Sequence, residues 1–200
     1  MINKFYFCSL LFLCSCTATP PKNVNNICDI FREKDDWYAD VKESYDKWGV
    51  PIHVTMAIMH QESRFVADAQ PPRPWLLGII PWFRSSSAYG YAQAQDSTWQ
   101  DYLANNHSRW SADRDDFADA SDFIGWYCSI SHNRLGLSKK DTQKLYLAYH
   151  EGHGGYSRKT YKKKPWLLKT AKKVNLKSKT FQSQLASCKD EFNSTSWFFW

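Results

Sequence analysis

The 200-residue chain is 43% hydrophobic, 16% aromatic and 23% charged, and its formal net charge is +6. This composition excludes a disordered chain, because a disordered chain lacks the apolar residues that build a core. The length suits one domain, and the sequence contains neither an internal repeat nor a second domain.

The N-terminal segment predicts export. Lys4 precedes an apolar run from Phe5 to Leu13, which is too short to span a bilayer and is typical of a secretory signal peptide. The run leads into Leu13-Cys14-Ser15-Cys16, which resembles the lipobox of bacterial lipoproteins. The resemblance implies removal of a signal peptide, residues 1–15, and lipidation of Cys16. The alternative is a plain secretory signal without a lipid.

Residues 16–34 are predicted to be a tether between the lipid anchor and the domain, since Thr, Pro, Lys and Asn dominate its first part. Thr17, rather than Asp, follows the lipidated cysteine. By the same resemblance, this favours a protein anchored on the periplasmic side of the bacterial outer membrane.

The rest of the chain predicts a mainly α fold with one domain over residues 35–192. Aromatic and aliphatic residues spaced at i, i+3 and i+4 predict a first helix over about 35–48. A second helix over about 51–63 is apolar on most sides, which indicates a central position. Further helices are predicted over about 96–105, 115–132, 138–149, 165–174 and 179–192.

A loop rich in proline and serine over residues 66–88 interrupts the helical pattern. It contains the apolar stretch Trp75–Phe83, and so many apolar residues in a loop require a core, a partner or a membrane. We expect a hairpin packed on the domain; the alternative is a loop that forms one lip of a binding cleft or rests on the membrane. The aromatic tail, residues 193–200, gives no basis for a prediction.

Export makes disulfides available to the mature protein. Cys128 lies in an apolar helical segment, where a buried free thiol behaves as a small hydrophobe. Cys28 and Cys188 lie near opposite ends of the mature domain, and chain termini are often close in space, so we predict that they form a disulfide. No cysteine and histidine spacing matches a zinc site, and we expect neither a metal nor a cofactor.

The C-terminal part of the chain is strongly basic. No acidic residue lies between Glu151 and Asp190, and the segment carries Arg158, Lys159, Lys162, Lys163, Lys164, Lys169, Lys172, Lys173, Lys177 and Lys179. Such a face attracts polyanions. In an exported protein these are anionic lipid head groups or acidic wall polymers rather than nucleic acid, and the alternative is a solvated face with no partner.

Glu62 is the residue most indicative of chemistry. It ends the apolar helix over about 51–63, and burial raises the pKa of a carboxyl group into the range of a general acid. The alternative is a glutamate that ends a helix and points to water.

Three short segments support the first interpretation. Glu62-Ser63 is followed by Gly90-Tyr91-Ala92-Gln93 and then by Ala148-Tyr149-His150-Glu151-Gly152. Their order resembles the catalytic domain of soluble-type lytic transglycosylases, and the resemblance covers roughly residues 37–156. It implies a lysozyme-like helical fold and cleavage of the MurNAc-GlcNAc β-1,4 bond in peptidoglycan glycan strands, with 1,6-anhydro-MurNAc ends.

The resemblance also implies roles for individual residues. Glu62 is the expected acid and base, and Ser63 is expected to bond near the reacting sugar. Gln93 is expected to hold an acetamido group, and the Tyr149 hydroxyl to reach towards the catalytic carboxylate.

This sequence departs from the family pattern at several positions. Tyr91 replaces an aliphatic residue and is expected to reshape a subsite wall, while His150 and Glu151 stand where the family has Asn and Ala. A second carboxylate could activate water, so a hydrolytic muramidase that uses Glu62 and Glu151 is one alternative function. A non-catalytic wall-binding scaffold of an envelope machine is the other.

Overall fold

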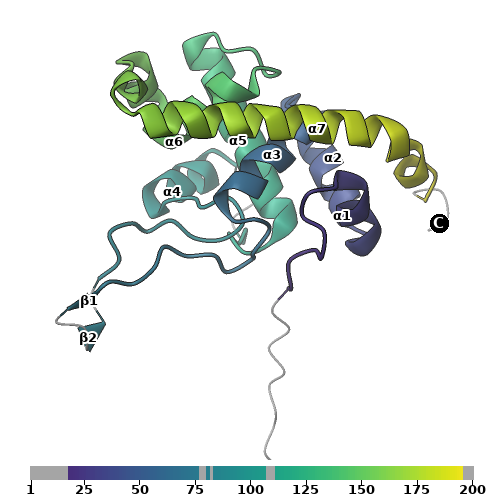
Figure 1. The fold of residues 1–200 in the computed structure, drawn as a ribbon, viewed down its shortest axis with the longest axis horizontal. Coiled ribbons are helices and arrows are strands. Elements are labelled where there is room, and N and C mark those ends of the chain that lie inside the picture. The colour runs from purple at the N-terminus through teal and green to yellow at the C-terminus, as the bar shows by residue number, and fades with distance from the viewer. Residues whose placement is uncertain (1–17, 77–79, 82, 107–110, 196–200) are drawn as a thin grey trace, which may run out of the picture.

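The computed structural model describes residues 18–76, 80–81, 83–106 and 111–195 (Figure 1). The elements in chain order are α1 (Ile27–Glu33), α2 (Trp37–Trp48), α3 (Ile52–Glu62), β1 (Trp75–Leu76), β2 (Ile80–Pro81), α4 (Asp96–Asn105), α5 (Phe117–Leu135), α6 (Thr142–Ser157), the 3-10 helix η2 (Thr160–Lys163) and α7 (Pro165–Thr195). The mainly α fold predicted from the sequence is thus confirmed. Among the described residues, no helix is both long and apolar enough to cross a membrane.

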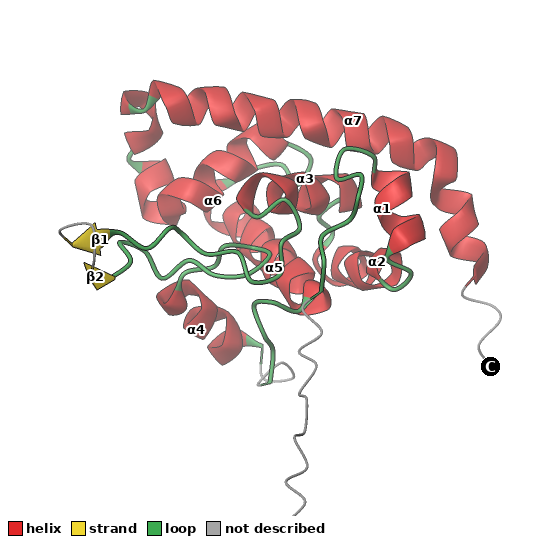
Figure 2. Ribbon diagram, turned by 60° about the horizontal axis from the view of Figure 1, so that its bottom comes forward, coloured by secondary structure: helices red, strands yellow, loops and turns green. Residues whose placement is uncertain are grey.

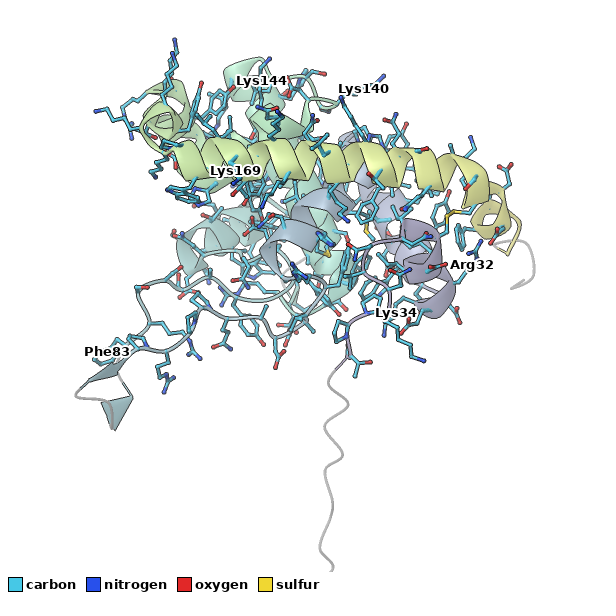
Figure 3. The ribbon with its side chains drawn as sticks, in the orientation of Figure 1. Arg32, Lys34, Phe83, Lys140, Lys144 and Lys169 are labelled. Atoms are coloured by element: carbon cyan, nitrogen blue, oxygen red, sulfur yellow. A yellow bond between two sulfur atoms is a disulfide. The ribbon has the colours of Figure 1, made fainter. Side chains whose placement is uncertain are left out.

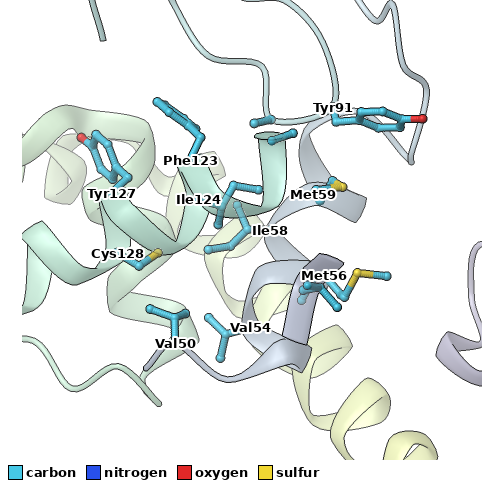
Figure 4. Packing of buried hydrophobic residues seen from close by; sticks show 14 of the residues in the cluster. Val50, Val54, Met56, Ile58, Met59, Tyr91, Phe123, Ile124, Tyr127 and Cys128 are labelled. Atoms are coloured by element: carbon cyan, nitrogen blue, oxygen red, sulfur yellow. The ribbon is translucent and has the colours of Figure 1, made fainter. Parts of the chain in front are cut away.

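Helix α3 lies at the centre of the fold because it is apolar on nearly all sides. Its residues Val54–Met59 are all buried, and it contacts α2, α5 and α7. Figure 4 shows Ile58 of α3 and Ile124 of α5 among the buried side chains of the core. The helix that carries Glu62 is therefore held on several sides by other helices.

Helices α2 and α5 approach each other closely at Gly125. A Cβ atom there would lie 2.5 Å from the Ser44 Oγ and 2.7 Å from the ring of Trp48, so a larger residue would push the helices apart. The buried carboxylate of Asp122, one turn away, accepts hydrogen bonds from the indole of Trp48 at 2.8 Å and from the Tyr102 hydroxyl at 2.7 Å. These bonds connect α2 and α4 to α5 and fix α4 beside the site described below.

Helix α7 is a single helix of 31 residues where the sequence predicted two (Figure 1). The predicted break at residues 175–178 contains neither Gly nor Pro, so nothing there interrupts the backbone hydrogen bonds. Ser178 continues the buried side of the helix, and Thr142 donates a hydrogen bond to its hydroxyl at 2.9 Å. Ser178 is thus a buried polar group whose hydroxyl has a hydrogen-bond partner.

The N-terminal part of the domain also differs from the prediction. The predicted tether, residues 16–34, includes helix α1, whose first turn is capped by the side chain of Asn26. Helix α1 packs against α7, and the predicted disulfide between Cys28 and Cys188 is present, with a Cα–Cα distance of 6.1 Å. Cys128 is a buried free thiol, as predicted.

The loop between α3 and α4 carries a short antiparallel hairpin, in which Trp75 pairs with Pro81 and Leu76 with Ile80. The arms of the loop lead the hairpin away from the helical body, beyond α4 (Figure 2). A hairpin is therefore present, but it is not packed on the domain. Phe83, just after it, is 82% exposed. The predicted tail begins inside α7, and residues 196–200 lie outside the described part of the chain.

Candidate active site

Glu62 is the last residue of α3, and a strained turn follows it. Arg64 and Phe65 have φ angles of 53° and 63°, a left-handed conformation that costs a bulky residue on the order of 1–3 kcal/mol. The fully buried ring of Phe65 and the hydroxyl of Ser63 hold this turn. The Ser63 Oγ accepts the Phe65 N–H at 3.1 Å and donates to the Met59 carbonyl at 3.3 Å. The helix therefore ends at the carboxylate, and the chain turns away directly after it.

The surroundings of Glu62 favour its protonated form. The side chain keeps partial solvent contact through a cavity, but protein atoms enclose its carboxyl group, and this desolvation raises its pKa from 4.5 to about 7. The hydroxyl of Tyr146 donates a hydrogen bond to the carboxylate and opposes part of the rise. The last turn of a helix disfavours negative charge as well. Glu62 can thus hold a proton near neutral pH and release it to a partner.

The turn Gly90–Gln93 forms a second side of the site. Gly90 has φ 79°, and a Cβ atom there would clash with the Arg114 carbonyl, so the turn requires glycine. The Nε2 of Gln93 donates to the carbonyls of Ala69 at 2.7 Å and Gly90 at 2.9 Å. Because both partners are acceptors, the amide orientation is fixed, and its Oε1 stays available to accept a hydrogen bond from a ligand.

Helix α6 supplies two tyrosines, one turn apart, that face the same site. The Tyr149 hydroxyl donates to the Ala92 carbonyl at 2.6 Å and so connects α6 to the Gly90–Gln93 turn. Burial, followed by the charge of Glu62, raises the pKa of Tyr149 well above its usual value. The hydrogen bond to Glu62 comes instead from Tyr146. Tyr149 was predicted to reach towards the carboxylate, and the charge of Glu62 does act on its hydroxyl, while the hydrogen bond comes from Tyr146, which was not predicted.

Glu151 is ionised and fully engaged. Helix α6 is kinked at Gly152, where φ is 72°, and the kink brings Glu151 to η2 and the start of α7. Its carboxylate accepts hydrogen bonds from Lys164 at 2.7 Å and from Thr160, and it lies 3.3 Å from His150 Nδ1. Desolvation raises the pKa of Glu151, but these three partners outweigh it and leave the pKa below its usual value.

These residues surround one cavity of about 410 Å³. Its walls come from α3, the Gly90–Gln93 turn with the residues after it, α5 and the kink of α6. The lining residues are Glu62, Ser86, Ala88, Gln93, Ala94, Gln95, Thr98, Phe123, Tyr127, Tyr149, His150, Glu151 and Gly152. No group of three or more His, Cys, Asp or Glu residues in the described part of the chain is arranged to hold a metal ion.

A family model described as a transglycosylase SLT domain matches residues 4–188, which is most of the chain. The chain belongs to the transglycosylase SLT domain family. A search among curated proteins and a search among solved structures gave no match. Membership of this family and the helical architecture together confirm the predicted mainly α, lysozyme-like domain. They support a function of the peptidoglycan lytic transglycosylase type.

Within this SLT domain, the structure corrects two of the predicted substrate contacts. Tyr91 is 1% exposed and packs edge-on against Trp37 and Phe117 in the core, so it forms no wall of the cavity. Ser63 is buried in the turn after α3 and does not line the cavity. Both residues support the backbone that carries the neighbouring site residues.

The sequence reasoning missed Tyr146 in this SLT domain. The available signal was its spacing, since residues at i and i+3 lie on the same side of a helix and Tyr149 was already a candidate. The remaining predicted residues, Glu62, Gln93, Tyr149, His150 and Glu151, all line one cavity.

Proposed function

We propose that this protein is a peptidoglycan lytic transglycosylase that cleaves the MurNAc-GlcNAc β-1,4 bond and leaves 1,6-anhydro-MurNAc ends. The observation that carries the proposal is Glu62, a carboxyl with a pKa of about 7 in a cavity of a transglycosylase SLT domain. A group with this pKa is protonated in a large fraction of molecules at neutral pH and can protonate the leaving oxygen of a glycosidic bond.

The proposed reaction needs only one carboxyl group of the enzyme. Glu62 donates its proton to the bridging oxygen as the bond to C1 of MurNAc breaks, and the carbonyl of the 2-acetamido group stabilises C1. The Glu62 carboxylate then removes the proton of the C6 hydroxyl, whose oxygen closes onto C1 to give the anhydro ring. The Gln93 Oε1, which has no hydrogen-bond partner among the described residues, is suited to accept the acetamido N–H.

The engagement of Glu151 argues against the hydrolytic alternative. A base that activates water needs a free lone pair aimed at the water, while this carboxylate is held by Lys164, Thr160 and His150. Its lowered pKa also makes it a weak base. We therefore assign Glu151 the role of fixing the kink of α6 that forms one wall of the cavity.

The cost of a buried carboxyl group argues against a non-catalytic scaffold. A glutamate that binds glycan without chemistry has no need of a raised pKa, and perturbed carboxyl groups in cavities concentrate at catalytic sites.

Product analysis tests the proposal. Purified peptidoglycan digested by the protein should yield anhydro ends in mass spectrometry, and Glu62→Gln should fold normally and lose turnover. Glu151→Gln is the matched control, which should still yield anhydro products. Reducing ends from the wild type would establish the muramidase, and no products at all would favour the scaffold.

We further propose that the protein is exported and anchored by a lipid on Cys16 at the periplasmic side of the outer membrane. The signal peptide and Cys16 lie outside the described residues, and the Cys28–Cys188 disulfide supports an oxidising compartment. The lysines of α7, such as Lys169 in Figure 3, and those of the segment before it would then face anionic lipid head groups or wall polymers. Labelling with radioactive fatty acid and membrane fractionation of wild type and Cys16→Ser test the anchor.

A further inference from the structure

A second cavity, of about 540 Å³, opens beside the Glu62 cavity. The two cavities share Ser86 and Ala88 in their linings, so a ligand could extend from one into the other. The second cavity lies between the base of the hairpin loop and the start of α4. It is lined by Gln70, Arg73, Phe83, Arg84, Ser86, Ser87, Ala88, Tyr89, Asp96 and Arg114. Figure 3 shows Phe83 at the base of the hairpin, at the far end of the loop arms.

We call it the arginine cavity, because Arg73, Arg84 and Arg114 line it and Asp96 is the one acidic residue among its lining residues. Arg114 Nη1 lies 2.8 Å from Asp96 Oδ1, so these two charges compensate each other. Two positive charges, on Arg73 and Arg84, then remain for a ligand.

The wall near Arg114 is built rigidly. Arg114 also donates to the carbonyls of Ala94 at 2.9 Å and Ser87 at 3.2 Å, and its guanidinium lies 5.2 Å from the centroid of the Tyr89 ring. The Tyr89 hydroxyl donates to Asp115 at 2.9 Å. Arg114 therefore holds the shared wall of the two cavities in place.

Arg73 and Arg84 are free to bind an anion. Arg84 donates from Nε to the Pro71 carbonyl at 3.0 Å, and this bond orients its guanidinium. The two terminal nitrogens of Arg84 have no partner among the described residues, so they can donate to a ligand. The structure gives Arg73 no polar partner among the described residues, and both side chains are exposed. A guanidinium in this state binds a carboxylate through two parallel hydrogen bonds.

We propose that the arginine cavity binds carboxylates of the stem peptide that MurNAc carries, and so makes the enzyme prefer peptide-bearing glycan. The inference rests on the proposed function. The sugars of a glycan strand are uncharged once the lactyl group is in an amide bond, so they offer no counter-charge to Arg73 and Arg84, which have no carboxylate partner among the described residues. The stem peptide carries free carboxylates, and it leaves the strand at the MurNAc residues, one of which must lie beside Glu62.

The cleavage test compares two substrates, peptide-bearing glycan strands and the same strands stripped of peptide by an amidase, whose freed lactyl carboxylates are then converted to neutral amides. Arg73→Ala/Arg84→Ala should lower kcat/KM on peptide-bearing strands about tenfold, the loss expected for hydrogen bonds to a charged group, and leave stripped strands unchanged. Lys140→Ala/Lys144→Ala, which removes two cations far from Phe83 in Figure 3, is the matched control and should change neither rate. Equal losses on both substrates, or no loss on either, would overturn the proposal.

A binding test separates this proposal from the proposed function. In the Glu62→Gln background, calorimetry with soluble fragments should show tighter binding of the peptide-bearing fragment, and adding Arg73→Ala/Arg84→Ala should remove the difference. Equal affinities for both fragments would refute peptide recognition, whatever the cleavage product. If peptide-dependent binding is present but the wild type cleaves no substrate, the proposed function fails while the arginine cavity stands.

Discussion

The raised pKa of Glu62 has a cost in stability that can be measured. A carboxyl group that is protonated more readily in the folded than in the unfolded protein stabilises the fold only while it carries the proton. Its contribution is complete below the unfolded pKa of 4.5 and is lost as the pH rises through about 7. We therefore expect Glu62→Gln, which cannot ionise, to become the more stable protein as the pH rises.

The pKa change sets the size of the effect. One pKa unit corresponds to about 1.4 kcal/mol, so a rise from 4.5 to about 7 amounts to at most about 3 kcal/mol. Solvent contact through the cavity reduces this figure. We expect the stability gained by Glu62→Gln over wild type to be about 1–3 kcal/mol larger at pH 8 than at pH 5.

Urea unfolding followed by tryptophan fluorescence at the two pH values measures this difference. Asp35→Asn removes one exposed carboxylate just before α2 and controls for the change in net charge. If the Glu62→Gln gain is the same at pH 5 and pH 8, the carboxyl is not protonated preferentially in the folded state, and the reasoning from burial to general acid fails.

Three further predictions concern the supports of the site. Tyr146→Phe removes a hydrogen bond that stabilises the Glu62 carboxylate, so the fall of kcat/KM on the alkaline side should move to higher pH; an unchanged profile contradicts that contact. Gly90→Ala should lower the free energy of unfolding by more than about 1 kcal/mol in urea titrations, because a left-handed residue with no room for a Cβ must move; a neutral result contradicts the turn. Reduction of the Cys28–Cys188 bond should lower the thermal midpoint, with an entropic limit of about 5 kcal/mol, and an unchanged midpoint would argue against the bond.

The helical fold could be predicted from periodicity, but two of its boundaries could not. The buried side of α7 passes through Ser178, whose hydroxyl is satisfied by Thr142 from α6. Because that partner lies on another helix, the local sequence pattern does not show that the helix continues through residues 175–178. Helix α1 has only seven residues, too few to show a period, and it is held against α7 through Cys28.

The candidate site could likewise be predicted only in part from the sequence. The three motifs were sufficient to predict Glu62, Gln93 and Tyr149, which line one cavity, because each motif is a short local segment of the sequence. The state of Glu151 depends on Lys164, thirteen residues away in the next element, and on the kink at Gly152 that joins them. The contact with Lys164 decides whether Glu151 is a second catalytic acid or one member of an ion pair, and the spacing of residues in the sequence does not reveal that contact.

The long helix α7 limits how far this SLT domain can be truncated. It runs along both α3, which carries Glu62, and α6, which carries Tyr146 and Tyr149 (Figure 2). The stretch that contains the three sequence motifs, roughly 37–156, leaves this helix out together with α1. A fragment limited to that stretch would expose to water the sides of α3 and α6 that α7 covers, so a minimal expression fragment has to retain residues 27–195 and the disulfide that joins α1 to α7.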